Sequence, residues 1–149
     1  MAKPDPHATR MAAWEQFLRA HAAITERLNQ ELVGERELPL TWYDVLIQLQ
    51  ERGGRMRMHE LARSILFSKS GLTRLVDRMA QAGVVRREAC SEDGRGAYAA
   101  ITAAGLRVLA KARPAHHRGI EQHFGGLLTD AEAAAIESGL RMVAVAGHV

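Results

Sequence analysis

The chain has 149 residues, of which 47% are hydrophobic and 25% charged, a composition that predicts one globular domain over residues 1–149. No apolar run is long enough to span a membrane, the N-terminus lacks a signal-peptide core, and the single cysteine, Cys90, cannot form an internal disulfide. We therefore expect a cytoplasmic protein with no membrane role. The net charge is only +3, but Lys and Arg outnumber Asp and Glu between Arg52 and Arg95, which favours a polyanionic partner.

Two helices are predicted in the first third of the chain, after a polar segment over residues 1–8 that we expect to be poorly ordered. The first runs from about residue 9 to Gly34, and its apolar stripe recurs at three- and four-residue steps: Trp14, Phe17, Leu18, His21, Ile24 and Leu28. The second begins with Thr41 as its N-cap and ends at the glycines 53–54. One face of it is apolar: Trp42, Val45, Leu46 and Leu49.

The middle of the chain predicts two short helices between strands. A small strand is expected over residues 55–58 and a helix over 59–67; Ser68 then caps a further helix that ends at Gly83. Residues 84–89 and 97–101 alternate as strands do, and the polar, glycine-containing segment 90–96 joins them as a hairpin.

Two more helices complete the chain. Thr102 caps a long helix that reaches about residue 124, with a kink or break at Pro114, and Thr129 begins the capping-box sequence T-D-A-E of the last helix. The fold class is thus mainly α with a small β-hairpin wing, a winged helix-turn-helix over residues 41–101. The outlying helices, residues 9–34 and 102–146, carry apolar stripes that need a partner, and a homodimer supplies one.

The helix after Ser68 has the features of a DNA-reading element. Leu72, Leu75, Val76 and Met79 form its core stripe, which leaves hydrogen-bond donors on the other faces. We expect Arg74 to read base edges in the major groove. The residues expected to hold phosphates are Ser68, Lys69, Ser70, Thr73 and Arg78. Taken alone, the pattern also fits an amphipathic surface helix, but the preceding helix and the following hairpin favour the DNA-binding interpretation.

The hairpin supplies a second candidate contact. Arg95 at its tip suits the negative potential of a narrow minor groove, nearby Asp93 could hold its side chain in place, and Arg86 lies on the strand that leads to the tip. The alternative is an ordinary D-G turn.

These features resemble the multiple antibiotic resistance regulator (MarR) family of bacterial transcription factors over nearly the whole chain. The most specific stretch is M-H-E-L-A-R-S-I-L-F-S-K-S-G-L-T-R-L-V-D-R-M-A-Q-A-G-V-V-R-R, and E-D-G-R-G-A-Y-A-A-I-T-A-A-G resembles the family's wing and the start of its dimerisation helix. By resemblance, Arg95 is the wing arginine and Asp93 its ion-pair partner. The sequence departs from the family at Gly94, where arginine is common, and at His59, where a Ser or Thr cap is frequent.

The resemblance implies a DNA-binding homodimer. Its two recognition helices would lie in successive major grooves of a near-palindromic site, whose half-sites are roughly 10 base pairs apart. It also implies a repressor released by a small aromatic or anionic effector. Trp14, His21, Trp42 and Tyr43 are the candidate ligand-binding residues. Core packing is the alternative for the two tryptophans, and a polar network at the dimer interface is the alternative for His21.

Other functions receive less support from the sequence. His117 and Glu121 are spaced as two metal ligands on a helix, but no further cluster accompanies them, so we predict no metal site. A redox switch at Cys90, in the wing loop, is a further alternative, as is an architectural or protein-binding winged helix with little sequence specificity. No catalytic motif or cofactor signature is present in the sequence, so we expect no enzyme activity and no cofactor beyond the effector.

Overall fold

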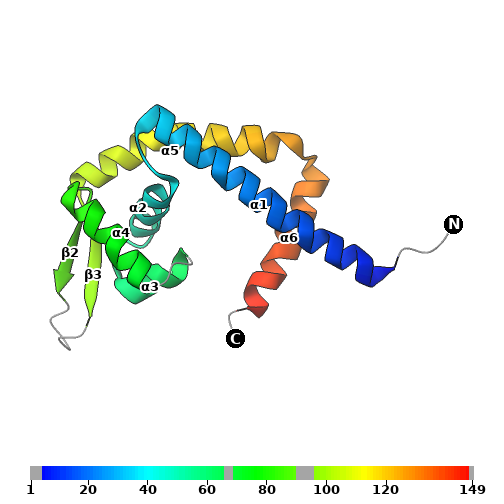
Figure 1. Cartoon of the computed structure of the whole chain (residues 1–149), viewed down its shortest axis with the longest axis horizontal. Helices are drawn as coiled ribbons and strands as arrows, with labels where there is room; N and C mark the ends of the chain where they lie inside the picture. Colours follow the sequence, from blue (N-terminus) through cyan, green and yellow to red (C-terminus); the bar gives the residue numbers. More distant parts are fainter. Residues whose placement is uncertain (1–4, 66–68, 90–95, 148–149) are drawn as a thin grey trace. The chain divides into compact units, whose positions relative to one another are not determined.

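The computed structural model describes residues 5–65, 69–89 and 96–147, with the side chains of Lys69 and Ser70 left out. The fold is mostly helical with one small antiparallel sheet, which confirms the predicted fold class (Figure 1). The elements in chain order are α1 (Pro6–Arg36), α2 (Leu40–Glu51), β1 (Arg55–Arg57), α3 (Met58–Ser64), α4 (Lys69–Gln81), β2 (Val85–Ala89), β3 (Ala97–Ile101), α5 (Ala103–His123), the 3-10 turn η1 (Gly125–Leu127) and α6 (Asp130–Ala146). Among the described residues, no helix is long and apolar enough to cross a membrane.

The chain divides into two compact units. The central unit comprises Asn29–Ala115, and the terminal unit comprises Met1–Leu28 together with His116–Val149. The unit boundaries fall inside α1 and α5, so each of these helices contributes to both units. The expected winged helix-turn-helix, residues 41–101, lies within the central unit.

The hydrophobic core of the central unit joins its helices to one face of the sheet. Val45, Leu46 and Leu49 of α2 and Leu61 of α3 are fully buried, and they belong to the same cluster as the apolar stripe of α4. The strand order is β1-β3-β2, with both pairings antiparallel, and Met56 lies opposite Ala99 in the register. Because side chains alternate between the faces of a sheet, the buried Met56 and Ala99 assign their face to the core and leave the other face outside.

Close backbone contact holds the first turn of α5 against the start of the hairpin. Thr102 caps α5, as predicted, since the N–H of Gly105 donates to its Oγ1 at 3.0 Å, and the Thr102 hydroxyl donates to the carbonyl oxygen of Gly83 at 2.6 Å. A Cβ at Gly105 would lie 2.1 Å from the carbonyl oxygen of Val84, so only glycine fits at this position. Gly83 itself ends α4 with a φ of +78°.

Several predicted helix ends were wrong by a few residues. The first helix begins at Pro6, within the segment expected to be poorly ordered, and passes through Gly34 to Arg36; Glu37, with a φ of 52°, provides the left-handed residue that ends it. The second begins at Leu40 with Pro39 as N-cap, so Thr41 is inside the helix. Instead of a Thr41 cap, Asn29 Oδ1 of α1 accepts a hydrogen bond from the N–H of Leu40 at 3.0 Å, a tertiary contact that local sequence patterns do not encode.

Two further boundaries in the middle and the second half of the chain also differ from the expectation. The strand predicted over 55–58 ends at Arg57, which is the N-cap residue of α3, so that helix starts at Met58, one residue before His59. The carboxylate of Glu60 accepts from the N–H of Arg57 at 3.4 Å, which satisfies a free N–H at the helix start without a cap from His59. At Pro114 there is no break, because α5 continues to His123.

The terminal unit leaves most of its apolar side chains exposed. Its last helix begins as predicted, with Thr129 and Glu132 forming a capping box, and the hydrogen bonds from Thr129 hold the pKa of Glu132 below its usual value. By contrast, no side chain of α6 is buried, and on α1 Trp14 is 55% exposed. The described residues of this unit therefore leave much of the apolar stripes on α1 and α6 uncovered, although Leu28 at the end of the α1 stripe is buried.

Candidate nucleic-acid interface

The interface begins with α4, whose two faces are sharply different. Leu72, Leu75, Val76 and Met79 are all buried, with exposures of 2% or less, and they occupy one face at spacings of three and four residues. This confirms the predicted core stripe. Arg74 and Arg78 are exposed on the outer side, and Thr73 and Asp77 are half-buried between the two faces. The burial of the stripe fixes the rotation of α4 and turns both arginines outward.

Some of the predicted DNA-binding residues lie outside the described part of the chain. These are Ser68, which was expected to cap α4, and Asp93 and Arg95 of the wing tip, together with Gly94 and Cys90 of the same loop. Lys69 and Ser70 form the first turn of α4, but their side chains are not described. Roles for these residues in DNA binding stay predictions.

An ion pair ties α4 to the wing. Arg87 of β2 donates through Nη1 to Oδ1 of Asp77 at 2.8 Å, and α4 packs along β2 (Figure 1). Both side chains are partly exposed, so the pair contributes little to stability, about 0–1 kcal/mol. Its main effect is on geometry. The ion pair links α4, which carries the exposed Arg74 and Arg78, to β2, the strand that leads into the wing loop.

The outer face of the sheet carries a basic cluster that the sequence analysis identified only in part. We call it the wing cluster: Arg55, Arg57, Arg86, Glu88 and Tyr98. The antiparallel register places Tyr98 between Arg57 and Glu88, and Ala100 between Arg55 and Arg86, so all three strands contribute to one face. Of this cluster, only Arg86 was among the predicted site residues.

The contacts within the wing cluster hold its cations in place. Glu88 accepts from Arg55 Nε at 2.9 Å and from Arg86 Nε at 3.0 Å, and the Arg55 guanidinium carbon lies 3.9 Å from the centroid of the Tyr98 ring. The Arg57 guanidinium lies 5.3 Å from the same centroid, also within cation-π range. Three arginines against one carboxylate leave the cluster with a net charge of +2. The alternation R-M-R in β1 indicates that Arg55 and Arg57 share a face, because residues two positions apart on a strand point to the same side of the sheet.

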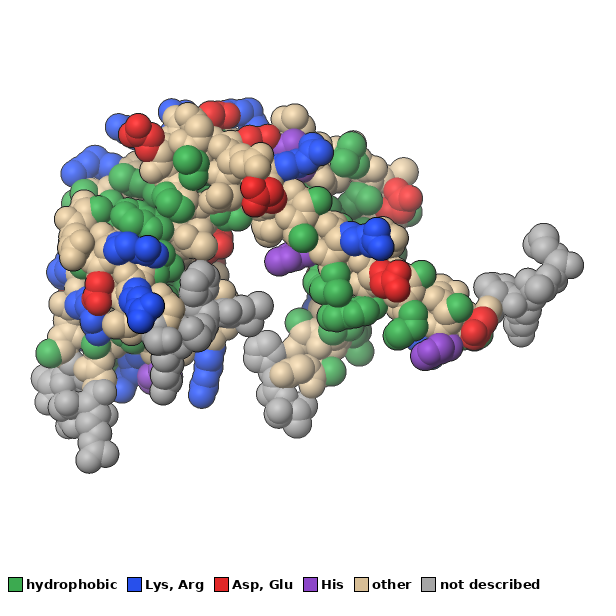
Figure 2. Space-filling model, viewed as in Figure 1, with side chains coloured by type: hydrophobic (Ala, Val, Ile, Leu, Met, Phe, Trp, Pro, Cys, Tyr) green, Lys and Arg blue, Asp and Glu red, His purple; other side chains and the backbone are tan. Residues whose placement is uncertain are grey.

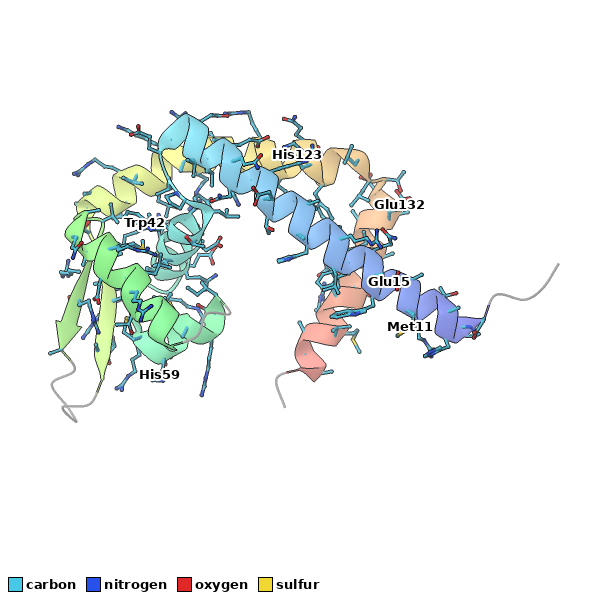
Figure 3. The ribbon with its side chains drawn as sticks, viewed as in Figure 1. Met11, Glu15, Trp42, His59, His123 and Glu132 are labelled. Atoms are coloured by element: carbon cyan, nitrogen blue, oxygen red, sulfur yellow. The ribbon has the colours of Figure 1, made fainter. Side chains whose placement is uncertain are left out.

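The four candidate effector-binding residues fall in different units. Trp14 and His21 belong to the terminal unit, and Trp42 and Tyr43 belong to the central unit, so a single pocket formed by all four stays a prediction. Tyr43 is buried in the core, and this burial raises the pKa of its hydroxyl, with the charge of Arg113 acting in the opposite direction. Trp42, labelled in Figure 3, is half-buried against the same core. His59 is exposed at the start of α3.

His21 lines an apolar groove within the terminal unit. The groove has a volume of about 520 Å³, and its walls come from α1, α6 and Phe124, with Phe17 and Ile24 beside His21 on α1 and Ile136, Gly139 and Leu140 on α6. The Phe17 and His21 rings lie 6.3 Å apart between centroids. Figure 2 shows hydrophobic side chains gathered at this place on the surface. Trp14 lies one turn away, 6.0 Å from the Phe17 ring, and does not line the groove.

The described residues contain no group of three or more His, Cys, Asp and Glu that could hold a metal ion. His116 and His117 lie 6.2 Å apart between ring centroids, and burial together with the charge of His117 lowers the pKa of His116. The described part of the chain thus adds no ligands to the pair formed by His117 and Glu121.

The arrangement of the central unit defines a class of protein. A short helix, a second helix with buried and arginine-bearing faces, and a following antiparallel hairpin form a winged helix-turn-helix, the arrangement that places a helix in the major groove of DNA. A family model described as MarR family matches residues 37–96, a range that includes α2, both helices of this motif and the first strand of the wing, and ends before β3.

Two solved structures are similar in sequence as well as in fold. AbsC, a MarR family transcriptional regulator from Streptomyces coelicolor, is 32% identical over 99% of both chains, with a TM-score of 0.85. A second MarR family transcriptional regulator from the same organism, solved in complex with DNA, is 31% identical over 92% of this chain and 90% of the other, with a TM-score of 0.82. The chain therefore belongs to the MarR family and is a DNA-binding transcriptional regulator.

A third structure is similar in fold alone. BpsR of Bordetella bronchiseptica, whose DNA binding is regulated by 6-hydroxynicotinic acid, is 18% identical over 89% of this chain and 98% of the other, with a TM-score of 0.79. No curated protein sequence matches the chain. Members of the family are transcription regulators rather than enzymes.

Proposed function

We propose that the protein is a homodimeric repressor that binds a near-palindromic operator through two copies of α4 and two wings. The observation that carries the proposal is the orientation of α4, whose buried stripe turns Arg74 and Arg78 away from the core. The structure of the 31% identical relative in complex with DNA supports the same use of this module.

The contacts to DNA divide by chemistry. Arg74 reads a base edge, most naturally the two acceptors of a guanine, while Thr73, Arg78 and the first turn of α4 hold phosphates. Arg95, positioned by Asp93, enters the minor groove. Arg86 contacts the backbone beside the wing, and Arg55 and Arg57, which share its face of the sheet, extend this contact.

A gel-shift titration with selected operator DNA and a random duplex tests this assignment. Arg74→Ala should lower affinity for the operator and reduce the preference over random DNA by about 1–3 kcal/mol. Arg78→Ala should weaken binding to both duplexes alike and lower the salt slope by about 1. Unchanged binding by both variants contradicts the proposed recognition helix, and equal binding of operator and random DNA by the wild type favours an architectural protein instead.

The dimer is proposed from the exposed apolar surface of the terminal unit. A water-exposed groove of this size, flanked by Phe17, Phe124 and Leu140, is costly for a protein that remains monomeric, and the same elements of a second copy are its most economical cover. In the proposed division of the chain, residues 9–34 and 102–146 are accordingly the dimerisation helices and residues 41–101 the DNA-binding module.

Sedimentation analysis of two α6 variants tests the dimer. Leu140→Glu places a charge in the groove and should shift the protein to monomers, whereas Ser138→Glu, on an exposed position that does not line the groove, should leave the dimer intact. A wild-type protein that sediments as a monomer at micromolar concentration contradicts the proposal.

We further propose that a small aromatic or anionic effector releases the repressor from DNA. The regulation of BpsR by 6-hydroxynicotinic acid is the precedent within the fold, and Trp14, His21, Trp42 and Tyr43 are the candidate contacts in this chain. A thermal-shift screen of aromatic acids with the wild type and with the Trp14→Ala and His21→Ala variants tests this. A stabilising acid whose effect survives both substitutions removes these two residues from the site.

A further inference from the structure

A second cavity lies wholly within the central unit, at the junction of α2 and α3. It has a volume of about 230 Å³ and is lined by Asp44, Ile47, Gln48, Ser64 and Ile65. The three α2 residues are spaced by three and four positions and so share one face, and the other two are at the end of α3. The fully buried side chains of α2 are at other positions, while Ile47 and Ile65 pack against the edge of the core, so the cavity lies beside the core and outside the interface described above.

Among the described residues that line the cavity, Asp44 is the only one with a charged side chain. Within the described residues no Lys, Arg or His forms an ion pair with it, and no hydrogen bond reaches its carboxylate. Partial burial raises the pKa of Asp44 to about 6, because the surroundings solvate the carboxylate less well than water does. A cation placed in the cavity would restore the lost solvation.

The other lining groups restrict the kind of cation. Gln48 offers an amide oxygen, and the Ser64 hydroxyl donates to the carbonyl oxygen of Leu61 at 2.9 Å, which leaves lone pairs of its oxygen free to accept a hydrogen bond. Ile47 and Ile65 provide apolar walls. One carboxylate is a poor ligand set for Mg²⁺ or Ca²⁺, which take six or more oxygen ligands. An organic ammonium instead has three N–H donors, which match the three acceptors of the cavity.

We propose that this cavity binds a small organic ammonium, with Asp44 as its counter-charge, Gln48 and Ser64 as additional acceptors, and Ile47 and Ile65 against its apolar body. The site differs in place and in charge preference from the site proposed for an aromatic acid. Because α3 precedes α4 and packs against it, an occupant at the α2–α3 junction is placed to influence the recognition helix. This influence on DNA binding rests on the proposed function, whereas the binding of the ammonium does not.

Isothermal titration of the full-length protein with benzylammonium at pH 7.5 tests the site, with benzyl alcohol and benzoate as the neutral and anionic probes of similar shape. Benzylammonium should bind in a saturable manner and the other two should not. Asp44→Asn keeps the side-chain shape and should weaken benzylammonium binding at least tenfold, while Asp130→Asn, the same change at an exposed position of α6, should leave it unchanged. Equal affinity of the Asp44→Asn variant and the wild type, or equal binding of benzoate, overturns the proposal.

A second variant locates the ligand without removing the charge. Ile47→Trp fills the cavity and should abolish binding, and circular dichroism establishes that the variant is folded; binding that survives in the folded variant overturns the assignment. Operator titrations with and without benzylammonium form a separate arm. If the wild type binds benzylammonium but does not bind the operator, the proposed function is contradicted and the ammonium site is supported. If it binds the operator but not benzylammonium, the ammonium site is contradicted and the proposed function is supported.

Discussion

Glu88 limits the positive charge of the wing cluster, so its replacement by glutamine should tighten DNA binding. The glutamine keeps the shape of the side chain but removes the ion pairs to Arg55 and Arg86. Both arginines are more than half exposed, so the two pairs together contribute about 1–2 kcal/mol to stability at most, a small part of the 5–15 kcal/mol of a typical domain. The variant should therefore fold, and a change in DNA affinity can be assigned to charge.

The size of the effect follows from counterion release. One additional phosphate contact by a released arginine steepens the dependence of affinity on salt by about 0.9 in logarithmic units, which is about 3.5-fold more affinity lost between 50 and 200 mM salt. Fluorescence anisotropy with a labelled operator at four salt concentrations measures this slope for the wild type and Glu88→Gln.

The matched control is Glu137→Gln, which also removes an exposed carboxylate paired with an arginine, Arg141 of α6. It changes the net charge by the same amount but lies outside the central unit. Glu88→Gln should bind DNA several-fold more tightly than the wild type at 50 mM salt, and the control should not. An equal gain in both variants refutes the local argument, because net charge alone would then explain it.

Three further changes test the packing, capping and electrostatics of the fold. Leu72→Ala empties a fully buried position of α4 and should lower the free energy of unfolding in urea by about 2–5 kcal/mol; a loss below about 1 kcal/mol would mean that α4 is not packed as described. Thr129→Ala removes the cap of α6 and should cost about 1 kcal/mol, with Thr129→Ser as the variant expected to retain it. Since the pKa of Asp44 is raised from 3.8 to about 6, the folded state binds its proton more tightly than the unfolded state, so the contribution of Asp44 to stability falls as pH rises from about 4 to 6. The Asp44→Asn variant should therefore have a higher free energy of unfolding in urea than the wild type at pH 7.5 but not at pH 4. A difference between the two proteins that does not change with pH contradicts the raised pKa of Asp44.

Helices with strong local signals were predictable from the sequence. The stripe of α4 follows from its apolar spacing, and the caps by Thr102 and Thr129 follow from residue types at fixed offsets, since these interactions join residues three positions apart. The order of elements and the resemblance to the MarR family also follow from such local patterns, and the comparisons confirm the family.

Features that depend on distant parts of the chain were decided by the tertiary structure. The start of α2 is one example, because the N–H of Leu40 donates to Asn29 of α1 and Thr41 does not cap the helix. The wing cluster is another, since β1 must pair with β3 before Arg55 can lie on Tyr98 and reach Glu88. The groove beside His21 and the cavity beside Asp44 likewise depend on which helices pack together. Local sequence specifies which residues can form a helix or cap it, but contacts across the fold determine which of the described charged side chains are paired.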